Sequence, residues 1–298
     1  MTQPAVNNES QKIRYLQFSA LIAASIAIWW RPLVATGRIA ASTEAHTHIL
    51  LVLPLSLALI YFENGNRTTR FATSWFGIGF LIAALAIRML PEIILFPAND
   101  GVSIGMFGLV VWWIGSVTVC FGAEILRVLS FQLCFLFLLV PFPEPVLKEM
   151  TEFMQRASAW AAAILFHLAG VPGTRDGVLI SIPGLTIEVA QECSSIRSSM
   201  MLLLITLILA YLFLDTWWRK TLLILAVIPL SIAKNALRIF TIPELGTRVD
   251  PSYLHGKLHH HGGILFLGLA VIAILLLLWV LRKGDARNLP CEAAFSGQ

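Results

Sequence analysis

The chain has 298 residues, of which 57% are hydrophobic and only 13% are charged, and its mean hydropathy is +0.80. A soluble domain carries about 25% charged residues, so the composition excludes that class and predicts a polytopic membrane protein, organised as one membrane domain over residues 1–298. The net charge of +4 does not indicate nucleic-acid binding, and four cysteines without a Cys-x-x-Cys pair do not favour a disulfide framework.

Eight apolar segments are candidates for membrane-spanning helices, each of which needs ~20 mostly apolar residues. They cover roughly residues 15–34, 46–62, 71–90, 104–122, 128–141, 194–214, 220–241 and 260–281. With the N-terminus in the cytoplasm, the excess of Lys and Arg falls in the cytoplasmic segments, as membrane proteins favour. We therefore expect an all-α polytopic fold with about eight transmembrane helices and both termini in the cytoplasm.

Residues 146–169 have the pattern of an amphipathic helix. Apolar residues recur at intervals of three and four, whereas Lys148, Glu149 and Glu152 occupy the opposite side of the first half. This pattern predicts a helix that lies in the membrane interface. Because the second half of the segment is apolar, a ninth span remains an alternative.

A small β-hairpin is expected at residues 177–190. Two β-rich runs, 178–182 and 185–189, are separated by Pro183 and Gly184, which favour a turn. Because unpaired strand edges cannot face lipid, the hairpin should lie on the extracytoplasmic face, where it would cover the site.

The polar segment after this hairpin contains a candidate nucleophile. Cys193 precedes the sixth expected span, and the free N–H groups and dipole at a helix N-terminus stabilise a thiolate. Glu192 flanks the cysteine, and Arg197 is four residues on, so it would share the same helix face. The alternative is a small packed hydrophobe, which is our interpretation of Cys120 and Cys134 in their apolar surroundings.

Two later segments are candidates to meet Cys193. The expected span 220–241 is apolar except for Lys234, Asn235 and Arg238 near its outer end. We interpret Lys234 as reaching the lipid headgroups, whereas Asn235 and Arg238 are three residues apart and share a face. An arginine there offers fixed N–H donors to an oxyanion or a carboxylate.

The second such segment holds His255, His259, His260 and His261, at the start of the last expected span. A histidine could deprotonate a thiol and later protonate a leaving amine. In the eight-span topology these histidines, Cys193 and Arg238 fall on the same side of the membrane. Together they predict an acyl-transfer site that proceeds through a thioester, with no metal and no cofactor.

Two other classes of function remain open. The histidines, with His46 and His48 at another outer helix end, could serve a metal-dependent membrane hydrolase, although no His-Glu-x-x-His pattern is present. A non-enzymatic transporter could instead use Arg238, Glu188 and Glu192 as a polar pathway. No internal repeat or broken helix typical of transporters is evident.

From about residue 104 onward the sequence resembles the exosortase/archaeosortase family. The resemblance rests on residues 141–143, 170–172 with Gly177, the block 192–197, residues 235–239, and a histidine followed by a glycine pair. It implies that Cys193 is the nucleophile, that Arg238 stabilises the oxyanion or substrate, and that His259 is the general acid/base, with His260 and His255 as the next candidates. Asn235, Arg197 and Glu192 would support them. Ser194-Ser195, where many members have Ser-Gly, and Ile264, where Trp is common, depart from the family pattern.

The resemblance also implies substrates and a location. Family members are cysteine transpeptidases that act on exported proteins with a C-terminal sorting tail, which has a motif such as Pro-Glu-Pro, a hydrophobic span and a basic cluster. They are implied to pass the cleaved protein to an envelope acceptor amine, often in bacteria that make exopolysaccharide. The expected location is the cytoplasmic (inner) membrane, with the active site on the extracytoplasmic face.

Overall fold

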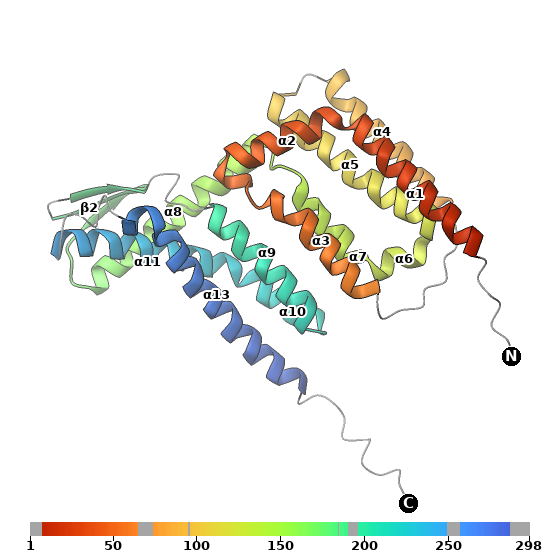
Figure 1. Ribbon diagram of the computed structural model, residues 1–298. Helices are drawn as coiled ribbons and strands as arrows, with labels where there is room; N and C mark the ends of the chain where they lie inside the picture. Colours follow the sequence, from red (N-terminus) through yellow and green to blue (C-terminus); the bar gives the residue numbers. More distant parts are fainter. Residues whose placement is uncertain are drawn as a thin grey trace, which may run out of the picture. The chain divides into compact units, whose positions relative to one another are not determined.

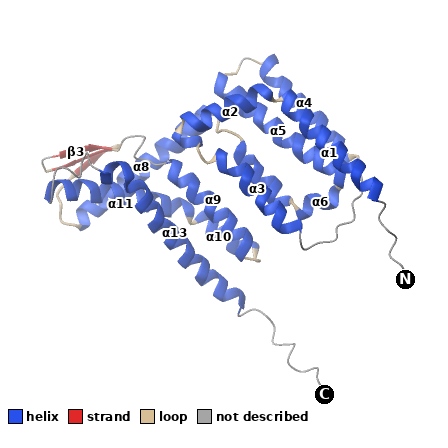
Figure 2. Ribbon diagram, viewed as in Figure 1, coloured by secondary structure: helices blue, strands red, loops and turns tan. Residues whose placement is uncertain are grey.

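The fold is almost entirely helical. The structure is a computed structural model that describes residues 8–64, 74–94, 96–183, 185–189, 196–248 and 257–286. Within these ranges, three short strands form one antiparallel sheet and nearly everything else is helix (Figure 2). The predicted fold class, a helical polytopic membrane protein with a small β element, is confirmed. The chain divides into two compact units, residues 1–147 and 148–298.

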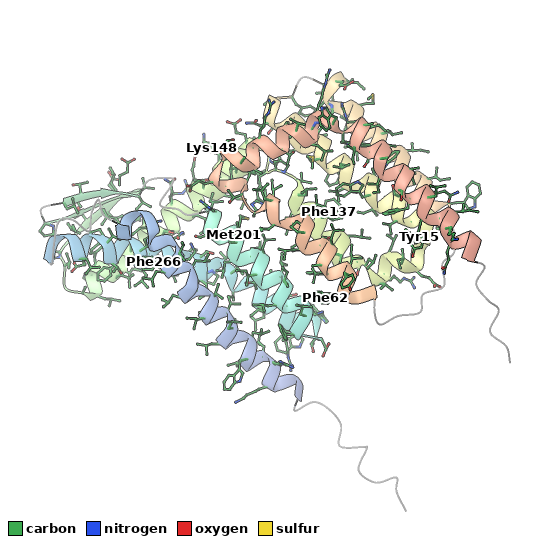
Figure 3. The ribbon with its side chains drawn as sticks, in the orientation of Figure 1. Tyr15, Phe62, Phe137, Lys148, Met201 and Phe266 are labelled. Carbon is green, nitrogen blue, oxygen red and sulfur yellow. The ribbon has the colours of Figure 1, made fainter. Side chains whose placement is uncertain are left out.

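In the first unit, helices pack around α5. The elements are α1 (Asn8–Ile28), α2 (Trp30–Ser42), η1 (Glu44–His46), α3 (Ile49–Asn64), α4 (Phe76–Ile93), α5 (Ala98–Phe121), α6 (Ala123–Val128), α7 (Ser130–Phe135) and η2 (Leu136–Leu139). Helices α1, α2 and α4 all lie against α5 (Figure 1). The ring of Phe137 in η2 packs at 5.3 Å from that of Phe107 in α5 (Figure 3).

The segment expected to be the first span, 15–34, is divided at Trp29. Helix α1 ends at Ile28, and α2 continues at an angle of 72° to it. Pro32 explains the break, because it has no N–H to donate to the carbonyl of Ile28 and its ring would clash with that group. Trp29 is fully buried at the bend, with its ring 5.4 Å from that of Trp112.

Helices α4 and α5 approach each other closely at two glycines. A Cβ atom on Gly77 would lie 2.6 Å from the backbone nitrogen of Val119 and 2.8 Å from the carbonyl oxygen of Gly115. A Cβ on Gly115 would lie 3.1 Å from the carbonyl oxygen of Gly77. Small residues that permit such backbone contact are typical of helix pairs in membranes.

In the part of the second unit that the structure describes, α8 and the sheet are accompanied by four further helices. Helix α8 (Glu144–Leu168) begins in the first unit, and the remaining elements are β1 (Thr174–Asp176), β2 (Leu179–Ile182), β3 (Leu185–Glu188), α9 (Ile196–Phe213), α10 (Trp217–Leu225), α11 (Val227–Arg248) and α13 (Lys257–Ala286). Helices α9, α10, α11 and α13 pack against one another through apolar side chains that include Leu202, Leu223 and Ile274 (Figure 1).

The sheet packs on α8 and α11. In the expected hairpin, Ile182 pairs with Leu185 and Leu179 with Glu188, and a third strand, β1, pairs with the other side of β2. Side chains on one face of β2 and at the end of β3 form a core with residues of both helices: Ile180, Ile182, Val189, Ala159, Ala162, Phe166, Ala236 and Ile239. This core fixes the sheet immediately before the Cys193 segment.

Six helices in the described chain are long and apolar enough to cross a membrane, and the number rises to eight if each of two bent pairs is one span. The six cover Glu44–Phe62, Phe76–Ile93, Asn99–Phe121, Ile196–Phe213, Trp217–Gly246 and Gly263–Lys283. The first bent pair is α1 with α2. The second joins Ser130–Leu139 to α8 across the proline-rich residues 140–143. That α8 lies in the interface stays a prediction.

Candidate active site

The predicted site residues differ in how much of each the structure describes. Cys193, Glu192 and His255 lie outside the described residues. His259 and His260 lie near the start of α13, where only the backbone is described. Asn235 and Arg238 in α11, and Arg197 in α9, are described with their side chains. The geometry of the candidate site is therefore built from α9, α11 and the residues that flank the cysteine.

Lys234 is the most buried charged side chain of this region. It is 5% exposed, and its Nζ donates hydrogen bonds to Ser198 Oγ in α9 and, at 2.7 Å, to Asn235 Oδ1. The interpretation that Lys234 extends to the lipid headgroups is therefore wrong. Its amino group is held inside the protein by contacts that include these two oxygens, because a polar group removed from water needs hydrogen-bond partners to offset its desolvation. The contact between Lys234 and Ser198 is a feature of the candidate site that the sequence did not reveal.

The Lys234–Ser198 bond joins α11, which bears the candidate arginine, to α9, which begins three residues after the candidate nucleophile in the sequence. Ser198 lies in the first turn of α9, five residues after Cys193 in sequence. Asn235 is 1% exposed, and Arg238, three residues further along α11, is half-buried. Arg197 is exposed in the first turn of α9. Lys234 thus connects α11 to the beginning of α9, and it also bonds the neighbouring Asn235.

The chain is anchored on both sides of the Cys193 segment. Val189 is 1% exposed, its N–H donates to the carbonyl of Val178 at 3.0 Å, and its carbonyl accepts from Gln155 Nε2 of α8 at 2.9 Å. On the other side, Ile196 is 8% exposed at the start of α9. The six residues 190–195, which include the cysteine, connect these two buried points.

The third expected segment belongs to the same unit. Helix α13, whose first turns include His259 and His260, packs against both α9 and α11. In Figure 3, Phe266 lies near the start of α13, and its side chain is 6% exposed. Helices α9, α11 and α13, which follow or contain the three predicted motifs, therefore pack together.

His46 and His48, the other histidines that the sequence pointed to, form a cluster within the first unit. His46 and His48 are both buried, their ring centres are 6.4 Å apart, and the ring of Phe142 lies about as close to each. Among the residues that the structure describes, no group of three His, Cys, Asp or Glu side chains could hold a metal ion.

Fold and site together define a polytopic membrane protein in which a buried lysine of α11 bonds both the neighbouring asparagine and the start of α9. The sequence model of one family, described as transmembrane exosortase (Exosortase_EpsH), matches residues 18–279, and the chain belongs to that family. The match begins well before residue 104, where the resemblance in motifs starts. Membership implies a transpeptidase. No curated protein and no solved structure matches the chain significantly.

Proposed function

We propose that the protein is a membrane cysteine endopeptidase and transpeptidase that removes the C-terminal sorting tail of exported proteins. The observation that carries the proposal is the hydrogen bond from Lys234 to Ser198. It connects the first turn of α9, which follows Cys193 in the sequence, to the segment of α11 that contains Asn235 and, one helical turn further on, Arg238. Membership of the exosortase family implies substrates with a sorting tail, and we propose that this tail carries a Pro-Glu-Pro-like motif and a hydrophobic span.

The reaction proceeds in two acyl transfers. The Cys193 thiolate attacks the carbonyl carbon at the cleavage motif, the C–S bond forms, and the carbonyl electron pair moves onto oxygen, where the Arg238 guanidinium stabilises it. The C–N bond then breaks as His259 gives a proton to the leaving amine. An acceptor amine of the envelope attacks the thioester, loses its proton to the histidine and releases the thiolate.

The proposed orientation places both termini in the cytoplasm and the site on the extracytoplasmic face of the inner membrane. The excess of basic residues in the cytoplasmic segments supports this orientation. Helix α8 would lie along the interface, where the hydrophobic span of a substrate enters from the bilayer. The partners are then exported proteins with a sorting tail, an acceptor amine and the lipid bilayer itself.

The test of this function is processing of a tail-bearing substrate by the purified full-length protein in lipid vesicles. Cys193→Ala should abolish processing, because no other group supplies the nucleophile, while Cys134→Ser serves as the matched control. Arg238→Lys should also fail, because a point charge does not replace the planar guanidinium. Normal processing by Cys193→Ala would refute the proposal, and full activity of Arg238→Lys would remove the arginine from the site.

The histidine assignment needs its own experiment. His255, His259, His260 and His261 are replaced one at a time by glutamine, and only one replacement should abolish processing. We expect it to be His259. Loss of activity on metal chelation, together with resistance to thiol alkylation, would favour a metal-dependent hydrolase instead.

The orientation is tested by thiol labelling of intact cells. In a variant that keeps Cys193 as the single cysteine, a membrane-impermeant reagent should label it from outside. Labelling that requires permeabilised membranes would place the site on the cytoplasmic face.

A further inference from the structure

We propose that the adjoining ends of α9, α10 and α13 form a binding site for an anionic phospholipid, with Lys220, Arg282 and Lys283 as the groups that bind its phosphate. This site is separate from the candidate active site and does not depend on the proposed function. Phe213, at the end of α9, is roughly 22 Å along the helix axis from Ser198, at a rise of about 1.5 Å per residue.

Two contacts join the end of α13 to the neighbouring helices. Arg219 of α10 donates from Nη1 to the carbonyl oxygen of Leu281 in α13, at 3.2 Å. The guanidinium carbon of Arg282, the next residue of α13, lies 5.6 Å from the ring centre of Phe213 in α9. Arg219 is only 6% exposed, so its contact lies inside the protein. The cations of α10 and α13 therefore gather around the end of α9.

The more accessible cations of this cluster lack an acidic partner. Lys220, Arg282 and Lys283 form no ion pair with any residue that the structure describes. Lys220 Nζ lies instead 5.8 Å from the ring centre of Tyr211, and Lys283 Nζ lies 3.5 Å from that of Trp279. An aromatic ring attracts a cation through its quadrupole but carries no net charge. These rings hold the cations in place and leave their charge unbalanced.

The sequence supplies little negative charge at this end. Across residues 196–225 and 263–283, Asp215 is the one acidic residue, and it is exposed in the connection between α9 and α10. Beyond them, Asp285 and Arg287 cancel each other in charge. With Arg219 included, the cations at this end exceed the carboxylate by three, which favours an anion from outside the protein.

The cluster lies where the phosphates of a bilayer lie. Phe213 ends one candidate membrane span, Trp217 begins the next, and Lys283 ends a third. Trp217, Trp218 and Trp279 are 76%, 46% and 57% exposed. Exposed tryptophans at span ends are typical of the membrane–water interface, at the level of the lipid headgroups. An anion that meets these cations is therefore a lipid phosphate.

The chemistry of the three side chains suits a phosphate. The guanidinium of Arg282 can donate two parallel N–H groups to two phosphate oxygens, and the lysine ammonium groups act as point charges. A basic residue at an anionic membrane surface strengthens the attraction about fivefold. A zwitterionic headgroup carries a positive group that the same cluster repels, so the site selects lipids with net negative charge.

The test is binding of dioleoyl phosphatidylglycerol to the purified full-length protein in neutral detergent micelles, measured by native mass spectrometry. Dioleoyl phosphatidylcholine and inorganic phosphate are the comparison ligands. We expect phosphatidylglycerol to bind at a lower mole fraction than phosphatidylcholine and to resist displacement by inorganic phosphate. Equal binding of the two lipids would overturn the proposal, and displacement by inorganic phosphate would overturn the assignment to a lipid.

Variants locate the site. Arg282→Gln should weaken phosphatidylglycerol binding about fivefold, whereas Arg282→Lys, which keeps the charge, should bind nearly as well as wild type. Arg156→Gln removes an exposed cation of α8 in the same unit and should leave binding unchanged. The triple variant with glutamine at positions 220, 282 and 283 should bind about 100-fold more weakly. Equal weakening by Arg282→Gln and Arg156→Gln overturns the proposal, and these single variants decide if the triple variant does not fold.

Discussion

Gly77→Ala tests the contact between α4 and α5, because the added methyl group would meet backbone atoms. The new Cβ would lie 2.5 Å from Val119 Cγ2, 2.6 Å from the Val119 nitrogen and 2.8 Å from the Gly115 carbonyl oxygen. The valine methyl could rotate away, but the two backbone atoms can move only if α5 moves as a whole. The substitution therefore forces the two helices apart.

Two opposing contributions set the magnitude of this effect. An extra methyl group in a well-packed interior forces the backbone to shift, and this typically costs about 1–3 kcal/mol. Alanine in a helix is favoured over glycine by about 1 kcal/mol, which acts in the opposite direction. Gly79→Ala, in the same helix, isolates the second contribution, because no atom lies within 4 Å of its Cβ position. The free energy of unfolding of Gly77→Ala should be about 1–3 kcal/mol below that of this control.

The assay is unfolding of both variants in mixed micelles with increasing dodecyl sulfate, followed by circular dichroism. The midpoint of Gly77→Ala should fall clearly below that of Gly79→Ala, while the helical content before unfolding stays the same. If Gly77→Ala is as stable as Gly79→Ala, α4 and α5 are not in backbone contact at this glycine, and our account of the first unit is wrong.

Two further contacts lead to predicted changes of similar magnitude in the free energy of unfolding. Gln155→Leu removes the buried donor to the Val189 carbonyl. It should lower the free energy of unfolding by about 1–3 kcal/mol in the same assay. Arg156→Gln, at the exposed neighbouring residue, is the control and should leave the free energy of unfolding unchanged. Equal effects of the two would show that the bond is not made. Asp100 Oδ1 accepts from the Glu144 N–H at the start of α8, at 2.9 Å. Asp100→Ala should therefore lose about 1 kcal/mol and Asp100→Asn much less, because Asn also accepts this bond; equal losses would contradict the capping role.

The sequence is sufficient to predict the part of the sheet in which two apolar runs flank turn-forming residues. Residues 178–182 and 185–189 flank a Pro-Gly pair, and β2 and β3 form there with the register of a hairpin. Strand β1 could not be predicted in the same way. Its residues, Thr174, Arg175 and Asp176, are all exposed and have no apolar alternation. Backbone pairing with β2, which leaves no pattern in the sequence, holds this strand in place.

The bend at Trp29 and the contacts of Lys234 show two different limits of prediction from the sequence. Pro32 was a visible signal for the bend, because a proline ends the preceding helix about four residues upstream, but hydropathy alone joins the two helices into one apolar segment. Lys234 gave no such signal. Its position near a helix end is equally consistent with headgroup contact, and the partner that decides, Ser198, lies 36 residues earlier in the sequence.

The candidate site is predictable as a set of motifs, but its chemistry is not. Family membership follows from the motif order, and α9, α11 and α13, which follow or contain those motifs, pack in one unit. The roles of Cys193, Arg238 and His259 stay predictions. A helix N-terminus and a polar neighbourhood favour a thiolate in many proteins, so only the proposed substitutions can assign the nucleophile and its base.

The buried lysine also constrains how the chain enters the membrane. Helix α11, inserted alone, would expose the ammonium of Lys234 to hydrocarbon, which costs a few kcal/mol on insertion scales. The acceptor in α9 lies earlier in the chain, so it is already synthesised when α11 emerges from the ribosome. Stable insertion of α11 should therefore require α9 to be present in the bilayer beside it. Lys234 thus couples the membrane insertion of α11 to that of α9. In a truncated chain that starts after α9, α11 should insert into the bilayer less stably.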